Sequence, residues 1–167
     1  MSNVLWLNGR ARQKMLAYAN ASFPLETGGM LLGYEANNGE AVVTSIIGPG
    51  PHARHFRDRF VPDAEYQQAE LEAHYTRTNG GETYLGDWHT HPDGESDLSN
   101  RDKRTLHHIA TTPASGTANP VMLIMAGDVR DWIIGAVRYV GFYRRFLFRR
   151  YDLTTLSVVI YEREVGM

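Results

Sequence analysis

The sequence predicts a single α/β domain in which helices flank a mixed central β-sheet. Short β-branched and aromatic runs alternate along the chain with segments whose apolar residues recur at helical spacing. Neither an internal repeat nor a low-complexity tract interrupts this order. The chain has 167 residues, of which 43% are hydrophobic, and this is enough to bury one core. We therefore expect one domain over residues 1–167.

The first elements are a strand and a helix. Residues 4–7 form an apolar, strand-like run. Residues 11–23 carry apolar side chains at helical spacing, and the helix should end at Pro24 because proline removes a backbone donor.

A hairpin and a second helix follow. Residues 30–34 and 41–47 are two strand-like runs, and the Asn-Asn-Gly sequence at residues 37–39 favours a tight turn between them. The charged stretch after it, through residue 60, is expected to be a solvated loop. Residues 63–78 then form a helical pattern, and Pro62 suits its start.

The next strand carries the most informative residues of the chain. Residues 84–91 are strand-like and end in His89-Thr90-His91, after which Pro92 cannot donate to a continuing ladder. Side chains two positions apart on a strand point to the same face, which directs both imidazoles toward one point. After a polar turn, a helix is predicted to begin near Ser99, with Asp102 in its first turn. Strand-like runs at residues 121–125, 132–139 and 158–161 complete the sheet.

The side chains of His89, His91 and Asp102 are candidate metal ligands. Two imidazoles and one carboxylate suit zinc, whose catalytic sites use three protein ligands and leave the fourth position to water. Such an ion polarises a carbonyl and lowers the pKa of bound water to about 7. The same ligands also fit non-haem iron. If they converge, the pattern predicts a metal-dependent hydrolase, with Zn²⁺ as the expected ion.

Ser99 and Asp102 have a second interpretation. A serine followed three residues later by an acid is the pattern of a helix N-terminal cap, which helices use without any chemistry. The coincidence of this pair with the two histidines favours a metal site. The residues alone leave a hydrolase, an oxygenase and a helix cap open.

The motif and its surroundings resemble a known family. His89-Thr90-His91-Pro92, with seven residues between His91 and Ser99 and two between Ser99 and Asp102, is similar to the JAMM motif of MPN/JAB-domain zinc metallopeptidases. The segment around Glu26 resembles the family's upstream glutamate. Further matches to the bacterial Prok-JAB branch are Gly48-Pro49-Gly50-Pro51, Phe60-Val61-Pro62-Asp63 and Gly86-Asp87-Trp88. The resemblance covers most of residues 24–102 and implies the MPN/JAB, cytidine deaminase-like fold.

The resemblance also implies a role for each site residue. His89, His91 and Asp102 would bind Zn²⁺, and Glu26 would be the general acid/base that activates the metal-bound water. Ser99 would stabilise the oxyanion of the tetrahedral intermediate. These roles match what amide hydrolysis requires, namely a base, a Lewis acid and a hydrogen-bond donor. The choice of one glutamate rests on the resemblance, because other carboxylates are available at Glu35, Glu82, Glu95 and Asp97.

The implied activity is that of a zinc isopeptidase or peptidase that cuts after the C-terminal residue of a ubiquitin-like modifier or a similarly conjugated protein. Small bacterial members of the family occur beside genes for E1-like and E2-like enzymes. In antiphage CBASS operons such a peptidase removes the conjugate from the signalling nucleotidyltransferase, and we expect this function. The alternatives are trimming of a sulfur-carrier or other ubiquitin-like precursor, a RadC-like or phage-tail JAB protein, and a non-catalytic MPN scaffold.

Composition narrows the partners and the compartment. The chain has no cysteine, which excludes a cysteine-type isopeptidase and indicates the cytoplasm. No apolar run is long enough for a secretion signal or a membrane span, so no membrane partner is expected. A net charge of -2 argues against a dedicated nucleic-acid binder. Arginines alternate with aromatic residues over residues 142–151, a pattern that a nucleic-acid surface shares, but we expect the outer face of a half-buried strand.

Overall fold

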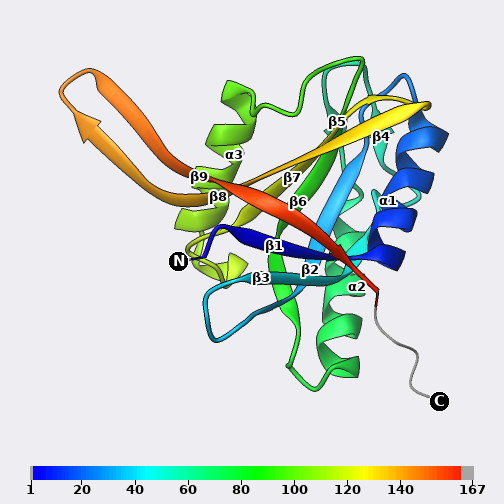
Figure 1. Ribbon diagram of the computed structural model, residues 1–167, viewed down its shortest axis with the longest axis horizontal. Coiled ribbons are helices and arrows are strands. Elements are labelled where there is room, and N and C mark those ends of the chain that lie inside the picture. The colour runs from blue at the N-terminus through cyan, green and yellow to red at the C-terminus, as the bar shows by residue number, and fades with distance from the viewer. Residues whose placement is uncertain (1, 163–167) are drawn as a thin grey trace.

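The computed structural model describes residues 2–162, in which seven strands form one mixed sheet (Figure 1). The strands are β1 (Val4–Asn8), β2 (Gly28–Glu35), β3 (Ala41–Ile47), β6 (Thr83–Pro92), β7 (Val121–Asp128), β8 (Asp131–Arg145) and β9 (Phe148–Tyr161). Their order is β1-β3-β2-β6-β7-β8-β9, and β1 pairs in parallel with both β3 and β9, which closes the sheet into a barrel. The predicted mixed α/β architecture is confirmed, and the closure is a feature that local sequence patterns did not indicate.

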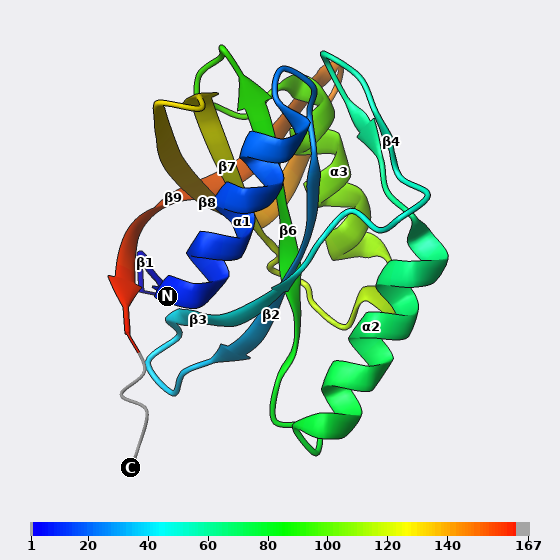
Figure 2. The ribbon, with the colours of Figure 1, turned by 90° about the vertical axis from the view of Figure 1, so that its right-hand side faces the viewer.

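Three α-helices pack on this sheet: α1 (Gly9–Ser22), α2 (Ala64–Arg77) and α3 (Asn100–Thr111), the last followed by the 3₁₀ turn η1 (Pro113–Ser115). In Figure 2, β6 runs between α1 on one side and α2 and α3 on the other. Helix α1 begins two residues before its predicted start because the Asn8 side chain caps it, accepting hydrogen bonds from the backbone of Arg10 and Ala11.

The core lies on both faces of the central strands. Along β7, one set of alternate residues packs in the cluster that contains Met15 of α1, and the other set packs against Leu106 of α3. A strand buried on both faces is apolar at every position, which explains the unbroken apolar sequence of β7. Each fully buried leucine contributes about 1.5–3 kcal/mol relative to exposure, so these contacts hold β6 and β7 firmly in place.

The stretch predicted to be a solvated loop contains a small hairpin. Its strands are β4 (Arg54–His55) and β5 (Phe60–Val61), which pair in antiparallel register. Two-residue strands are too short to show a period in the sequence, so the hairpin could not be predicted from it. No residue from 51 to 60 is fully buried, which agrees with a solvated segment. The hairpin lies at the right of Figure 2, and its residue Phe60 lines the same cleft as His89 and His91 of β6.

Strands β8 and β9 extend well past their predicted ends. Residues 142–151 form a two-stranded arm that projects from the body, at the left of Figure 1. Its side chains from Tyr143 to Arg150 are exposed on both faces. The expectation that its arginines cover the outer face of a half-buried strand is therefore wrong, because no layer of the body lies beneath most of the arm. No helix within residues 2–162 is long and apolar enough to cross a membrane.

Candidate metal centre

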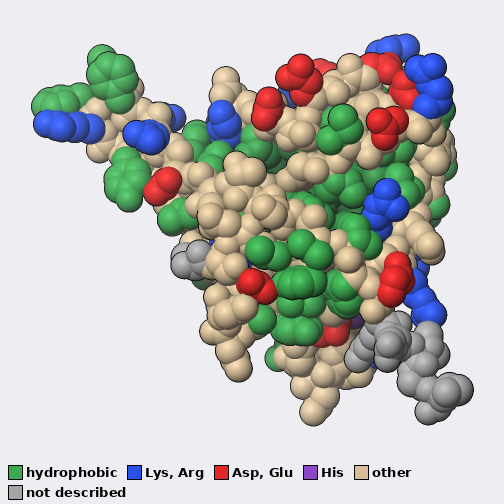
Figure 3. Space-filling model, viewed as in Figure 1, with side chains coloured by type: hydrophobic (Ala, Val, Ile, Leu, Met, Phe, Trp, Pro, Cys, Tyr) green, Lys and Arg blue, Asp and Glu red, His purple; other side chains and the backbone are tan. Residues whose placement is uncertain are grey.

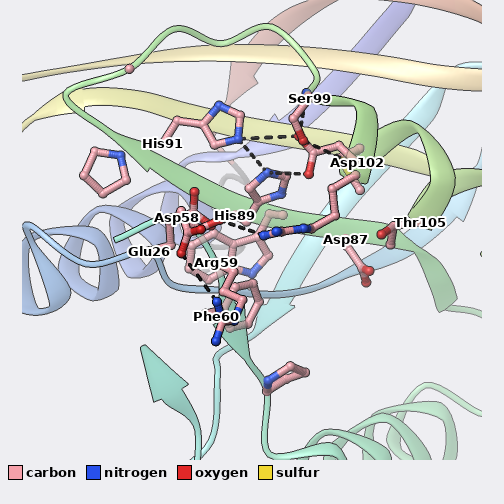
Figure 4. Close-up of a pocket in the computed structure, with 16 residues that line it drawn as sticks. Glu26, Asp58, Arg59, Phe60, Asp87, His89, His91, Ser99, Asp102 and Thr105 are labelled. Atoms are coloured by element: carbon pink, nitrogen blue, oxygen red, sulfur yellow. Dashed lines mark hydrogen bonds and ion pairs between the residues drawn. The ribbon is translucent and has the colours of Figure 1, made fainter. Parts of the chain in front are cut away.

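The structure brings the three predicted ligands together (Figure 4). The Nε2 atoms of His89 and His91 lie 3.0 Å apart. Asp102 reaches them from α3, with Oδ1 at 3.3 Å from His89 Nε2 and Oδ2 at 3.5 Å from His91 Nε2. Around tetrahedral zinc, with bonds of about 2.0–2.2 Å, neighbouring ligand atoms stand about 3.3 Å apart. The three side chains can therefore hold a metal ion, and their spacing fits zinc.

Strand geometry and a backbone carbonyl orient the two imidazoles. His89 and His91 share one face of β6, in register with Ile124 and Ala126 of β7. His91 Nδ1 lies 2.8 Å from the carbonyl oxygen of Glu95, to which it must donate. The tautomer is thereby fixed with the Nε2 lone pair toward the cleft, as a metal ligand requires.

Asp102 is held by a capping box at the start of α3. The backbone nitrogen of Ser99 donates to Asp102 Oδ2 at 2.8 Å, and Ser99 Oγ accepts from the backbone nitrogen of Asp102 at 3.2 Å. Burial alone would raise the pKa of Asp102, but hydrogen bonds with His89 and His91 outweigh it, so the pKa lies far below its ordinary value. The helix cap and the metal site are thus built from the same residues.

Glu26 lines the same cleft from the opposite side (Figure 4). It lies two residues before β2, where a reciprocal pair of hydrogen bonds joins Thr27 to Thr90 between the two histidines. The hairpin holds it from the other direction: the Glu26 nitrogen donates to Phe56 O at 2.7 Å, and His55 Nδ1 donates to Glu26 O at 2.9 Å. Glu26 is therefore tied to both the sheet and the hairpin.

Burial raises the pKa of the Glu26 carboxyl, and this effect outweighs the opposing influence of His89 and His91. The other carboxylates that the sequence left available are placed elsewhere. Glu35 is exposed at the end of β2, and Glu82 is bonded to His74. None of the four alternatives, Glu35, Glu82, Glu95 and Asp97, contributes to the lining of the cleft.

A glycine allows β2 to approach the ligand strand closely. Gly28 pairs with His89, and a β-carbon on Gly28 would collide with the carbonyl oxygen of Trp88 and the ring of Phe60. Only a residue without a side chain fits between the strand and the hairpin. The Gly-Gly sequence after Glu26 and Thr27 thus places the glutamate within the same cleft as the histidines.

The cleft has a volume of about 500 Å³ and contains residues for which the sequence indicated no role. Arg101 of α3 donates from Nη1 to Asp58 O at 2.8 Å, which links the helix to the hairpin. Asp87 accepts a hydrogen bond from the Tyr84 hydroxyl at 2.9 Å, and burial raises the pKa of Asp87 to about 6. An acid in a buried strand, two residues before a predicted ligand, was the available signal for Asp87.

Comparisons with known proteins agree with this geometry. The family model for prokaryotic homologs of the JAB domain, Prok-JAB, matches residues 9–135. The probable metalloprotease y4qB of Sinorhizobium fredii is 34% identical over 165 residues, which cover 97% of this chain and 99% of that protein. The CD-NTase/cGAS isopeptidase of Enterobacter hormaechei is 31% identical over 104 residues, 62% of this chain and 56% of that protein. The solution structure of the Desulfitobacterium hafniense protein DSY2949 has a similar fold, with a TM-score of 0.60 at 19% identity and coverage of 96% and 94%.

Proposed function

The chain belongs to the Prok-JAB family and is a metallopeptidase, and within that class we propose that it is a zinc-dependent isopeptidase. It would cut after the C-terminal residue of a ubiquitin-like modifier or a similarly conjugated protein, with residues 1–167 acting as one catalytic domain. The observation that carries this proposal is the cleft that holds Glu26 opposite the cluster of His89, His91 and Asp102.

The ligand set supports Zn²⁺ as the ion. Neutral imidazoles and a carboxylate at the spacing seen here are a donor set of catalytic zinc sites. When bound, zinc supplies a Lewis acid for the scissile carbonyl and lowers the pKa of water.

Glu26 would act as the base and then as the acid. It accepts a proton from the attacking water while the water oxygen bonds to the scissile carbon. The same proton then passes to the leaving nitrogen as the carbon–nitrogen bond breaks. A carboxyl whose pKa is raised by burial suits both steps near neutral pH, because it accepts and returns a proton readily.

Ser99 can serve as the oxyanion donor without giving up its cap. Its Oγ accepts the hydrogen bond from the Asp102 nitrogen through a lone pair, and this leaves the hydroxyl proton available to donate. The side chain lies at the rim of the cleft, next to the metal ligands. A donor there would stabilise the negative charge that develops on the carbonyl oxygen.

We further propose that the substrate is a conjugated nucleotidyltransferase of an antiphage CBASS system, in a pathway with E1-like and E2-like enzymes. The similarity to the CD-NTase/cGAS isopeptidase supports this choice. The alternative substrate, a sulfur-carrier or other ubiquitin-like precursor, would use the same residues. Substrate assays must separate the two.

The test is cleavage of an isopeptide conjugate of the nucleotidyltransferase, beside a linear ubiquitin-like precursor. Glu26→Gln and His89→Ala should each abolish cleavage, whereas Glu35→Gln, at an exposed glutamate at the far end of β2, should cleave like the wild type. Elemental analysis of the purified protein should find zinc. The proposal fails if the Glu26 and His89 variants cleave as fast as the wild type. A protein that binds no zinc and stays inactive after zinc addition would be a scaffold.

A further inference from the structure

The arm, residues 142–151, is the largest feature that the proposed reaction does not use. Its tip exposes three large apolar side chains, with Phe146 86% exposed, Leu147 97% and Phe148 81%. Contiguous apolar side chains on a projecting element are typical of an interaction site, because exposure of that much apolar surface to water is unfavourable.

The arm is ordered at its base. His107 of α3 lies with Nδ1 at 2.7 Å from the Tyr139 hydroxyl, and its ring packs against those of Phe142 and Tyr151 at centroid distances of 4.6 and 5.7 Å. The ladder then continues without interruption to the tip. The arm therefore presents its side chains in a fixed arrangement, and within residues 2–162 no third strand pairs with it.

The charge of the arm is unbalanced. It carries Arg144, Arg145, Arg149 and Arg150 and no acid, and none of the four forms an ion pair within the described part of the chain. Arg144 lies directly opposite Arg149 on the paired strand, and like charges at such positions are destabilising. The remaining chain has 13 basic and 19 acidic residues, a formal charge of -6. The body of this protein is thus electrostatically complementary to its own arm.

The body also offers an apolar surface of matching character. Tyr34, Val42, Trp6 and Val159 lie side by side on neighbouring strands β2, β3, β1 and β9, on the outside of the barrel. We call these four residues the apolar row. Figure 3 shows apolar side chains gathered over β1 and β3, with acidic side chains on either side.

One acid beside the apolar row can be identified. Glu40 accepts a hydrogen bond from Trp6 Nε1 at 2.6 Å, and this bond, with those from Ser2 and Asn38, lowers the pKa of Glu40. The Glu40 carboxylate is therefore charged near neutral pH. Glu35 belongs to the other face of the sheet, because it pairs with the buried Ala41.

We propose that the arm docks on the apolar row of a second copy of this chain. The apolar tip covers the row, and the arginines lie against Glu40. In a dimer with a twofold axis, the arm of each copy docks on the apolar row of the other, so both arms and both rows are covered. At about 150–250 Å² for each buried aromatic side chain, the four phenylalanines at the tips of two arms bury about 600–1,000 Å². The surfaces that they cover lose a similar area, which brings the interface to about 1,200–2,000 Å², the range that stable pairs bury.

The test is the molar mass of the full-length protein, measured by light scattering and by sedimentation over a range of concentration and salt. The wild type should form a dimer at low salt that weakens as salt rises, because arginine contacts are screened. Arg149→Glu combined with Arg150→Glu should weaken the dimer by at least about tenfold, and Val159→Lys should do the same from the other side. Lys14→Glu on α1, a charge reversal outside both surfaces, should leave the dimer unchanged.

A charge exchange distinguishes this contact from others. Glu40→Lys should weaken the dimer, and mixing that variant with the Arg149→Glu variant should restore association in the mixed pair. A monomeric wild type overturns the proposal, and so does a dimer that survives the arm substitutions. A dimer lost in the arm variant but retained in Val159→Lys and Glu40→Lys overturns the assignment to the apolar row. Monomeric wild type that binds DNA through the arm would assign the arm to nucleic acid instead.

Discussion

Replacement of Ser99 separates its two roles. Its hydroxyl oxygen accepts one of the two capping-box bonds, the 3.2 Å bond from the Asp102 nitrogen. The second bond is donated by the Ser99 backbone nitrogen to the Asp102 side chain, so it does not depend on the Ser99 side chain. Loss of the hydroxyl in Ser99→Ala should therefore cost about 1 kcal/mol of unfolding free energy, which is a fall of about 2–4 °C in Tm for a chain of this size.

Ser99→Gly is the informative variant. Glycine is tolerated at an N-cap with a loss of only a few tenths of a kcal/mol, so α3 and Asp102 should remain in place. If the hydroxyl donates to the oxyanion, Ser99→Gly should nevertheless lose about 10²–10³-fold in kcat. Ser99→Thr keeps a hydroxyl and a cap and should retain most activity.

The assay combines thermal unfolding, zinc content and kcat on the isopeptide substrate for all three variants. Zinc content must stay at the wild-type level, because a displaced Asp102 would also lower the rate. The reasoning is refuted if Ser99→Gly holds zinc and cleaves within about twofold of the wild type, since the hydroxyl would then serve only the helix cap.

Three further predictions concern the surroundings of the site. The hydrogen bond with Asp102 raises the pKa of His91 in the metal-free protein, so zinc must displace a proton when it binds. Titration calorimetry in two buffers should show proton release at about pH 6 and none at about pH 9. A zinc affinity that does not change with pH would contradict this prediction. Burial raises the pKa of Asp87 to about 6, so the native state holds a proton that the unfolded state loses, and wild-type stability falls as pH rises through that window. The free energy of unfolding of Asp87→Asn, relative to that of the wild type, should therefore rise by about 1–3 kcal/mol between about pH 4 and about pH 7. Urea unfolding in the presence of a chelator measures this difference, and a difference that does not change with pH would contradict the raised pKa. Gly28→Ala should lose about 1–3 kcal/mol of unfolding free energy and most activity, because the added β-carbon would collide with backbone and with the Phe60 ring. Gly141→Ala is the control and should be close to neutral, because no atom lies near its β-carbon. Equal Tm values for the two variants would refute the packing argument.

The convergence of the three candidate ligands could be predicted because local rules place them. Alternation along a strand puts His89 and His91 on one face, and the capping pattern puts Asp102 in the first turn of a helix. Both rules depend on residues within a few positions of each other. Glu26 lies 63 residues before His89, and no spacing rule joins the two, so only the resemblance to a known family selected it.

Other features depend on contacts between distant segments. The closure of the barrel pairs Val4 with Ser157, and nothing in either strand alone specifies that partner. The arm has the alternation of any strand, because the pattern of residues 142–151 is the same whether a layer covers them or not. Exposure depends on how the whole chain folds, so the sequence could not show that both faces of the arm are exposed.

The two halves of the site rest on parts of the protein that unfold at different free energies. The histidines belong to β6, which pairs with β2 and β7 in the middle of the sheet, whereas Glu26 depends on bonds to Phe56 and His55 in a small hairpin. Local opening of such a peripheral hairpin requires less free energy than opening of the central strands. Amide hydrogens near Phe56 should therefore exchange much faster than those of β6. If Glu26 is the base and zinc binds at the histidines, as proposed, a partly denatured sample would keep its zinc while losing its base. Bound metal would then be a poor measure of the active fraction.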